Sequence, residues 1–461
     1  MQCLSNPALF FTSEKKFQIF GSLRLTVVLL AVSTLLVLLG TLDQANYGIY
    51  HTQERYFNSW VVLSPVVSLL SLVVLKTYPE NLEFLAVPLP GGFLLGALLT
   101  INLVCAHFRY YRPGWRRGGI ILIHGGLILL IVSGFLGSAL QREWQMSLDE
   151  GGGPVRHLTA IRGSELALVR VGEEADTHHV APGSLLAPGE TIRFPGTDLT
   201  VRIEDFVGNS LIEERRRLIR MESAAEGGGG SGEVSERAAE LLGEDEVLLV
   251  PLPGVEPARI PPEQQRGLAA EGGVAAVEKK PTYRHGESNF ASAVATVEAG
   301  GEPLGTWLLS SALDFIPGIS RQSFEHEGET YRIELRFPRE YLPFSLALEE
   351  FTHKRHPNTD IPAEFASEVV LDNPETGEKR DIRISMNKPL RYAGHTFYQA
   401  SFANDDQTSV LQVVRNPSRL LPYISIAVVG AGLILHFMLR LVRFTNARSA
   451  DGASEPSNSN P

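Results

Sequence analysis

The chain has 461 residues, and its 52 acidic side chains outnumber its 41 basic ones, which gives a formal net charge of −11. This acidity argues against nucleic acid as a partner, because phosphate backbones attract basic surfaces. Both cysteines, Cys3 and Cys105, lie in the first quarter of the chain, and no C-x-x-C motif occurs. The composition therefore excludes a disulfide framework and a thiol reductant.

Apolar runs at both ends of the chain predict membrane-spanning helices, because a helix of about 20 residues satisfies its own backbone hydrogen bonds in lipid. Four runs qualify: residues 25–42, 91–108, 118–140 and 420–439. A fifth run, residues 60–75, is shorter and contains Pro65, so we expect it to be interfacial or re-entrant within an outer loop of residues 43–90. We expect the first run to be an uncleaved anchor, with a cleaved signal peptide as the alternative.

Basic residues predict the orientation of these spans, since short cytoplasmic segments are rich in Lys and Arg. There are three basic clusters. The first precedes the first span and consists of Lys15, Lys16 and Arg24. The second lies between the second and third spans (Arg109, Arg112, Arg116 and Arg117), and the third follows the fourth span (Arg440, Arg443 and Arg448). Four crossings put all three on the cytoplasmic side. We therefore expect residues 1–24, 109–117 and 440–461 to be cytoplasmic and residues 141–419 to be extracytoplasmic.

The polar middle of the chain predicts a large β domain. Short runs with alternating polarity and β-branched or aromatic content are separated by turn residues, which is typical of an antiparallel, sandwich-like fold. The clearest runs are residues 165–171, 198–206, 329–337, 344–351, 364–371, 396–402 and 408–414. The expected fold class is thus an integral membrane protein with four α-helical spans and a large extracytoplasmic, mostly antiparallel β domain.

Residues 221–280 differ from the rest of this domain. They are rich in Gly, Glu and Pro, a composition that buries too little apolar surface to offset the entropy of ordering the chain. We expect a disordered insertion there, and a loop that binds a partner conditionally is the alternative.

Three histidines fall within or at the end of predicted spans: His107, His124 and His436. Polar groups in a membrane are costly, so each is a candidate for a functional site, and all three lie toward the inner leaflet. A neutral imidazole can bind haem iron or zinc, or it can simply donate a hydrogen bond to a neighbouring helix. Haem is favoured over zinc because Gly125 and Gly126 leave room beside His124 for a flat ring.

The segment MNKPLRYAGHTFYQASF, residues 386–402, resembles the ResB/CcsB family of cytochrome c biogenesis proteins, the System II type. Residues 22–25 at the start of the first span, residues 40–44 at its end and the glycine-flanked His124 are similar to the same family. The resemblance extends over nearly the whole chain except residues 221–280.

The resemblance implies a multi-pass protein of the bacterial cytoplasmic membrane with its large domain on the periplasmic side. It implies a partner of the ResC/CcsA type, haem b as the transported group, His124 as a haem-iron ligand, and apocytochrome c with its C-x-x-C-H motif as the acceptor. A tryptophan-rich haem-handling loop is absent from this sequence. We therefore name no catalytic residue and expect this component of a haem lyase complex to share bond formation with the partner or leave it to the partner.

The family-like segment before the last span also predicts a docking surface or hairpin packing. The residues that we expect to serve there are Asn387, Pro389, Gly394, Phe397, Tyr398 and Gln399, with Phe397, Gln399 and Ser401 on one face of a strand. We do not expect His395 to bind haem, and we expect His178, His179 and His326 to be ordinary surface residues. The alternative function is a membrane-anchored sensor or adhesion module; a transporter would normally show paired repeats of discontinuous helices, and none is visible.

Overall fold

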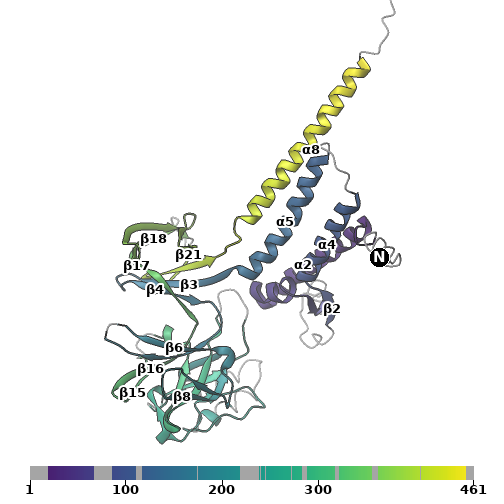
Figure 1. The fold of residues 1–461 in the computed structure, drawn as a ribbon. Helices are drawn as coiled ribbons and strands as arrows, with labels where there is room; N and C mark the ends of the chain where they lie inside the picture. Colours follow the sequence, from purple (N-terminus) through teal and green to yellow (C-terminus); the bar gives the residue numbers. More distant parts are fainter. Residues whose placement is uncertain are drawn as a thin grey trace, which may run out of the picture.

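The computed structural model describes residues 19–66, 86–110, 117–173, 175–218, 238, 240–243, 245–270, 273–282, 288–316, 321–355, 362–404 and 406–452. It consists of a group of helices and a large β domain at one end of them (Figure 1). The helices are formed by the apolar runs at the two ends of the sequence, and the strands come from the polar middle.

Four long helices form the first part: α2 (Leu23–Thr52), α4 (Gly92–Tyr110), α5 (Gly118–Leu140) and α8 (Leu421–Gly452). Among the described residues, three of them, α2, α5 and α8, are long and apolar enough to cross a membrane, while α4 is a shorter apolar helix. Helix α2 packs against α4, α4 against α5, and α5 against α8. The three longer helices agree with three of the four predicted spans.

The start of the fifth apolar run is a strand. β1 (Val61–Ser64) pairs with β2 (Val87–Pro90) in an antiparallel hairpin beside α2, and the short π-helix η1 (Gln53–Phe57) connects α2 to it. Residues 67–75 of that run lie outside the described part of the chain. The expectation that the whole run is interfacial or re-entrant therefore stays a prediction.

The β domain has two units, and the first is an eight-stranded antiparallel sheet in the order β19-β18-β17-β4-β3-β22-β21-β20. Its edge strands β19 and β20 contact each other, so the sheet curls around one core that includes Phe344, Phe397 and Leu411, all with 0% exposure. The strands are β3 (Arg142–Asp149), β4 (Val155–Ala160), β17 (Arg339–Arg355), β18 (Pro362–Asn373), β19 (Glu378–Ser385), β20 (Leu390–Tyr392), β21 (His395–Ala403) and β22 (Thr408–Arg415).

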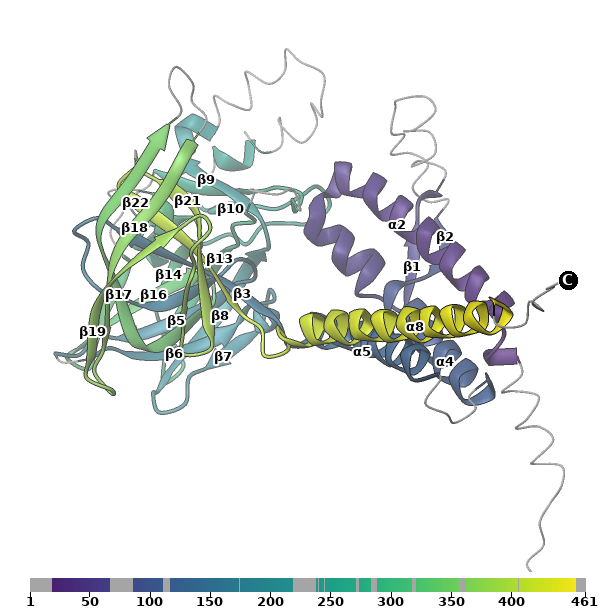
Figure 2. The same ribbon diagram turned by 90° about the horizontal axis from the view of Figure 1, so that it is seen from above.

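The second unit is inserted between β4 and β17, and two sheets enclose its core in the manner of a sandwich (Figure 2). One sheet has the order β11-β14-β13-β8-β7, the other β15-β16-β5-β6. The strands are β5 (Glu165–Arg170), β6 (Thr177–Pro182), β7 (Thr191–Arg193), β8 (Leu199–Val207), β11 (Gln265–Arg266), β13 (Ser292–Ala299), β14 (Glu302–Ser310), β15 (Ser323–His326) and β16 (Glu329–Arg336). Each of the seven runs predicted as strands coincides with, or lies within, a strand of one of the two units, to within a residue.

The prediction that residues 221–280 form one disordered insertion is wrong for its second half. A small sheet of β9 (Ser210–Glu214), β10 (Leu249–Val250) and β12 (Val274–Glu278) is ordered there, with Leu248 and Ala276 at 0% exposure. The low average hydrophobicity concealed two short apolar runs, residues 247–250 and 274–277, which become buried only by pairing with each other and with β9. Residues 221–237 lie outside the described part of the chain.

The helices continue almost directly into the first β unit. Only Gln141 separates α5 from β3, and residues 416–420 connect β22 to α8. β3 and β22 are neighbours in the sheet, with Arg142 opposite Arg415. The adjacent helix pair α5 and α8 therefore leads into an adjacent strand pair.

Candidate functional site

Small residues at intervals of seven bring α5 and α8 into close contact. Gly119, Gly126 and Ser133 are the buried residues of α5. A Cβ atom added to Gly119 would lie 2.6 Å from the backbone nitrogen of His436, and one added to Gly126 would lie 2.6 Å from Val429. Helices in lipid associate through such small residues because no hydrophobic force distinguishes a neighbouring helix from a lipid tail. This contact fixes the rotation of α5 about its axis.

With α5 fixed in this way, His124 faces α4. The rings of His124 and His107 lie 6.0 Å apart, centroid to centroid, at an interplanar angle of 86°. Both side chains are half-buried. A metal–imidazole bond is about 2 Å long, so this separation is compatible with one iron atom bound by a nitrogen of each ring. The structure thus brings together two of the three predicted haem-binding histidines.

The two glycines beside His124 have different surroundings. Gly126 is packed against α8, whereas a Cβ atom added to Gly125 would have no other heavy atom within 4 Å. Gly125 is also exposed. Only Gly125 therefore leaves the open space beside the imidazole that a flat macrocycle needs.

His436 occupies a different position. Its backbone lies against Gly119, five residues before His124 and so about 7–8 Å lower along α5. The ring contact described for His436 is with its neighbour Phe437, at 6.0 Å between centroids. The structure supports a backbone packing role for His436 in the α5–α8 contact, and its role as a haem ligand stays a prediction.

A groove of about 660 Å³ lies at the opposite ends of α2 and α5, where they meet the β domain. Tyr50, Asn58, Ser138 and Arg162 are among the residues that line it. The guanidinium of Arg162 lies 4.2 Å from the centroid of the Tyr50 ring, and Ser138 donates a 2.7 Å hydrogen bond to Asn58. The groove therefore combines aromatic and hydrogen-bonding groups with a cation.

The family-like segment forms the turn that follows β19, the strand β20, the next turn and all but the last residue of β21. Asn387, Gly394 and Tyr398 are exposed and Pro389 is half-buried, whereas Phe397 is fully buried in the core. Gln399 is also buried: its Oε1 accepts a 2.6 Å hydrogen bond from Ser367, and its Nε2 donates to Ser409 at 3.2 Å. A bulge between Gln399 and Ser401 ends the predicted shared face, because the extra residue reverses the alternation of side chains.

Of these six residues, the exposed Asn387, Gly394 and Tyr398 and the half-buried Pro389 are accessible to a partner. The side chains of Phe397 and Gln399 stabilise the sheet from inside. His395 is buried beside Trp144, with 5.9 Å between ring centroids, and its Nδ1 lies 3.0 Å from the carbonyl oxygen of Ala393. Burial, as the largest effect, lowers the pKa of His395.

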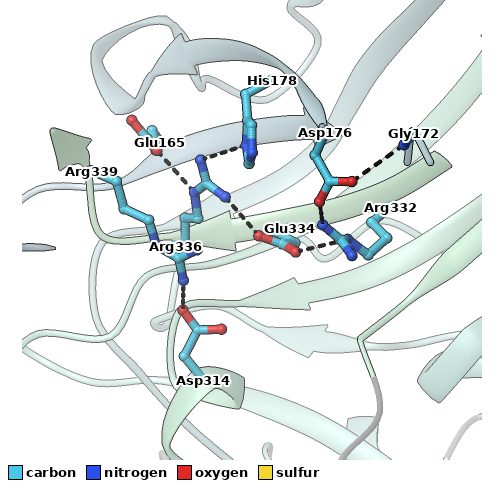
Figure 3. A network of polar contacts seen from close by, with 9 residues as sticks. All are labelled: Glu165, Gly172, Asp176, His178, Asp314, Arg332, Glu334, Arg336 and Arg339. Carbon is cyan, nitrogen blue, oxygen red and sulfur yellow. Dashed lines mark hydrogen bonds and ion pairs between the residues drawn. The ribbon is translucent and has the colours of Figure 1, made fainter. Parts of the chain in front are cut away.

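Two of the histidines expected to be ordinary surface residues have charged partners. His178 is half-buried, and its Nδ1 accepts from Arg336 at 3.4 Å within a network that joins β5, β6 and β16 (Figure 3). Burial, followed by the charge of Arg336, lowers the pKa of His178. Nε2 of His326 lies 3.1 Å from both carboxylate oxygens of Asp198, and these two residues with Glu327 form the group that could hold a metal ion among the described residues.

The match to a known protein family covers the last part of the β domain. Residues 306–409 match the model of the ResB-like family. Protein NrfI of Wolinella succinogenes is 33% identical over 103 residues, which are 22% of this chain and 11% of that protein. Cytochrome c biogenesis protein Ccs1 of Pyropia yezoensis is 31% identical over 100 residues, 21% of this chain and 22% of the relative.

These matches confirm the resemblance to the ResB/CcsB family over a defined segment. It runs from the middle of β14 to the beginning of β22 and includes the family-like residues 386–402. The matched segments span 11% and 22% of the two relatives. The helices that carry His107 and His124 lie outside residues 306–409, which match the family model.

Proposed function

Because residues 306–409 carry the sequence of the ResB-like family, we propose that this chain is a ResB-type subunit of a cytochrome c assembly complex. It binds haem in the membrane, helps to export it and presents it for covalent attachment to apocytochrome c. The name of the Pyropia relative, a cytochrome c biogenesis protein, supports the same process. Haem b is the cargo in this proposal, and bond formation is shared with, or left to, a membrane partner of the ResC/CcsA type.

The three long apolar helices support insertion into a membrane, with α4 as a fourth, shorter crossing. In this proposal the β domain lies on the periplasmic side, an orientation that the basic clusters of the sequence support. In this orientation His107 and His124 lie near the cytoplasmic ends of α4 and α5, where haem enters. The groove beside Arg162 lies at the periplasmic ends, where haem leaving the helices first meets the β domain.

The pair of imidazoles is the observation that carries the haem-binding part of the proposal. Imidazole nitrogens are common axial ligands of haem iron, and apolar surroundings favour the neutral form that can bind metal. The rings of His107 and His124 converge from two helices at 6.0 Å, and the open space at Gly125 adjoins them. His124 and His107 hold the iron, while Gly125 leaves room for the porphyrin.

A spectrum of the chain purified in detergent after co-expression with its ResC/CcsA-type partner tests the proposal. We expect a Soret band from bound haem b. His124→Gly and His107→Gly should each remove most of it, and added imidazole should restore it by filling the space left in either variant. His436→Gly is the comparison that separates the third histidine from this pair, because a glycine there leaves both converging rings in place.

Two results would overturn the proposal. A colourless wild-type complex would favour the sensor or adhesion alternative, in which the helices only anchor the β domain. A Soret band of unchanged intensity and position in both the His124→Gly and His107→Gly variants would show that haem binds elsewhere in the complex.

A further inference from the structure

The groove beside Arg162 lies at the level where the hydrocarbon core of a bilayer ends. Two of its lining residues, Gly137 and Ser138, belong to the last turn of α5, and Gln141 directly follows that helix. A helix of 23 residues is about 35 Å long, whereas the hydrocarbon core of a bilayer is about 30 Å thick. The last turn of α5 therefore reaches the layer of the lipid headgroups.

Exposed apolar side chains next to the groove mark the same level. Trp60, two residues after the lining residue Asn58, is 59% exposed, and so are Val61 and Leu63 on β1. The ring of Trp60 also contacts Phe93 on α4, with 6.1 Å between the centroids. Tryptophan is typical of the membrane–water interface, where its ring is in contact with both the acyl chains and the polar layer. The groove thus opens beside a surface that suits lipid.

The cation of the groove is available to an anion. Arg162 is exposed in the bend between β4 and β5, and its guanidinium lies 4.2 Å from the centroid of the Tyr50 ring. Within the described part of the chain, no carboxylate forms an ion pair with Arg162. Contact with an aromatic ring occupies a face of the guanidinium and leaves its N–H groups free, and their planar arrangement matches two oxygens of a phosphate.

Two carboxylates line the same groove. Glu54 is exposed, and its Oε1 accepts a 3.2 Å hydrogen bond from Asn58, whereas both oxygens of Glu143 accept bonds from glutamine side chains. Glu54 therefore has the more available carboxylate. It follows Tyr50 by four residues at the junction of α2 and η1, and side chains so spaced on a helix are neighbours, with about 5–6 Å between their Cβ atoms. Opposite charges thus lie near each other in the groove without being paired.

From this lining we propose that the groove binds the headgroup of a zwitterionic phospholipid with a primary amine, such as phosphatidylethanolamine. The phosphate accepts hydrogen bonds from the guanidinium of Arg162, and the ammonium group donates to the carboxylate of Glu54. The acyl chains lie along the apolar surface beside Trp60, in the leaflet next to the β domain. The volume of about 660 Å³ is in the range of pockets that bind small molecules. The bound lipid would hold the β domain at a fixed distance from the bilayer.

The charges of the lining disfavour other occupants. An anionic headgroup such as phosphatidylglycerol has no cation for Glu54 and Glu143, and the methylated ammonium of phosphatidylcholine cannot donate a hydrogen bond. Haem carries two negative propionates, but the lining has one arginine against two glutamates. The inference is therefore separate from the proposed passage of haem, and it requires only that the helices span a membrane.

Native mass spectrometry of the full chain, purified in detergent, tests this site by titration with the three phospholipids, all with the same acyl chains. We expect phosphatidylethanolamine to bind about tenfold more tightly than the other two, the effect of one hydrogen bond between charged groups. Arg162→Gln should weaken its binding by about the same factor. Arg156→Gln is the matched control, because Arg156 is also exposed and lies nearby on β4, but it donates to the carbonyl oxygen of Pro343 and does not line the groove.

A second variant separates the binding of the ammonium group from a general loss of structure. Glu54→Gln should weaken the binding of phosphatidylethanolamine but leave phosphatidylglycerol unchanged or more tightly bound, whereas a folding defect would weaken all three lipids alike. Equal affinity of the wild type for the three lipids, or equal effects of Arg162→Gln and Arg156→Gln, would overturn the proposal. Displacement of phosphatidylethanolamine by an excess of inorganic phosphate would also overturn it, because the occupant would then be a soluble phosphate.

Discussion

Nε of Arg336 donates a 2.9 Å hydrogen bond to Oε1 of Glu165, and the two side chains are only 2% and 10% exposed. They are directly opposite each other on the neighbouring strands β16 and β5. Nη1 of the same guanidinium donates to Glu334 at 2.8 Å, so one buried cation balances two carboxylates (Figure 3). Breaking such a network leaves uncompensated charge in a poorly solvated place.

Arg336→Met should therefore lower the free energy of unfolding of the β domain by about 3–5 kcal/mol. Arg332→Met is the matched control, because Arg332 lies on the same strand and pairs with Asp176 but its side chain is 21% exposed. That variant should lose about 1 kcal/mol or less. Urea unfolding followed by tryptophan fluorescence measures both, and equal losses would contradict the assignment of Arg336 as a buried counter-charge.

Protonation of His157 should lower the stability of the folded β domain in mild acid. Burial, followed by the nearby charges of Arg339 and Arg336, lowers the pKa of His157 to about 4 from its ordinary 6.5. The folded protein keeps this imidazole neutral, while the unfolded chain takes up a proton below about pH 6.5. The contribution of the neutral His157 to the free energy of unfolding is therefore complete above about pH 6.5, and it is lost as the pH falls toward about 4.

The expected loss over this interval is about 1–2 kcal/mol, after allowance for solvent screening at a half-buried side chain. Unfolding by urea at about pH 7 and about pH 4.5 measures it for the wild type and for His157→Gln, whose amide cannot be protonated in this range. The variant should show a shallower dependence on pH. Equal slopes would mean that His157 is not the group responsible.

The close contact of α5 and α8 predicts that substitution of one glycine of α5 separates the two helices, whereas substitution of another leaves their contact unchanged. Gly126→Val places atoms against Val429 and the carbonyl oxygen of Ser425, so the helices must separate, at a cost of about 1–3 kcal/mol. Gly134→Val is the control, because Gly134 is exposed and has open space where a Cβ would lie. Cysteines introduced on the facing helix surfaces report the separation, and a similar crosslinking yield in the two variants would count against this contact.

The turn between β20 and β21 predicts a pair of effects of opposite sign. Ala393 has a φ of +46° and Gly394 a φ of +79°, the combination of positive angles found in two-residue hairpin turns. Gly394→Val should destabilise the β domain by about 1–2 kcal/mol, whereas Ala393→Gly should be neutral or slightly stabilising. Thermal unfolding of the two variants checks this, and a destabilising Ala393→Gly would show that the turn gains nothing from glycine.

Sequence patterns that act within one element predict the helices and strands correctly. The apolar runs at the ends appear as helices, and alternating runs such as residues 344–351 and 364–371 appear in β17 and β18, because hydrophobic periodicity acts within one element. The sequence predicts only that His107 and His124 lie toward the same leaflet, whereas the 6.0 Å separation of their rings depends on how α4 packs against α5.

Features that depend on distant pairing were not predictable in this way. Residues 247–250 and 274–277 join a sheet with β9, although their surroundings read as disordered. The pairing of His353 with Asp406 joins residues 53 positions apart, and neither residue belongs to a recognisable motif. Ser401 is exposed, although alternation predicts it on the same face as Phe397 and Gln399, because a bulge follows Gln399.

The direct passage of α5 into β3 and of β22 into α8 has a mechanical consequence. Arg142 and Arg415 lie opposite each other where the two strands begin and end, and Asn416 is hydrogen-bonded to Gln141 at 2.9 Å. Because these connections are so short, a tilt or twist of the helix pair α5 and α8 is transmitted directly to β3 and β22. A movement of these helices can therefore change the position of strands in the β domain through the two short connections.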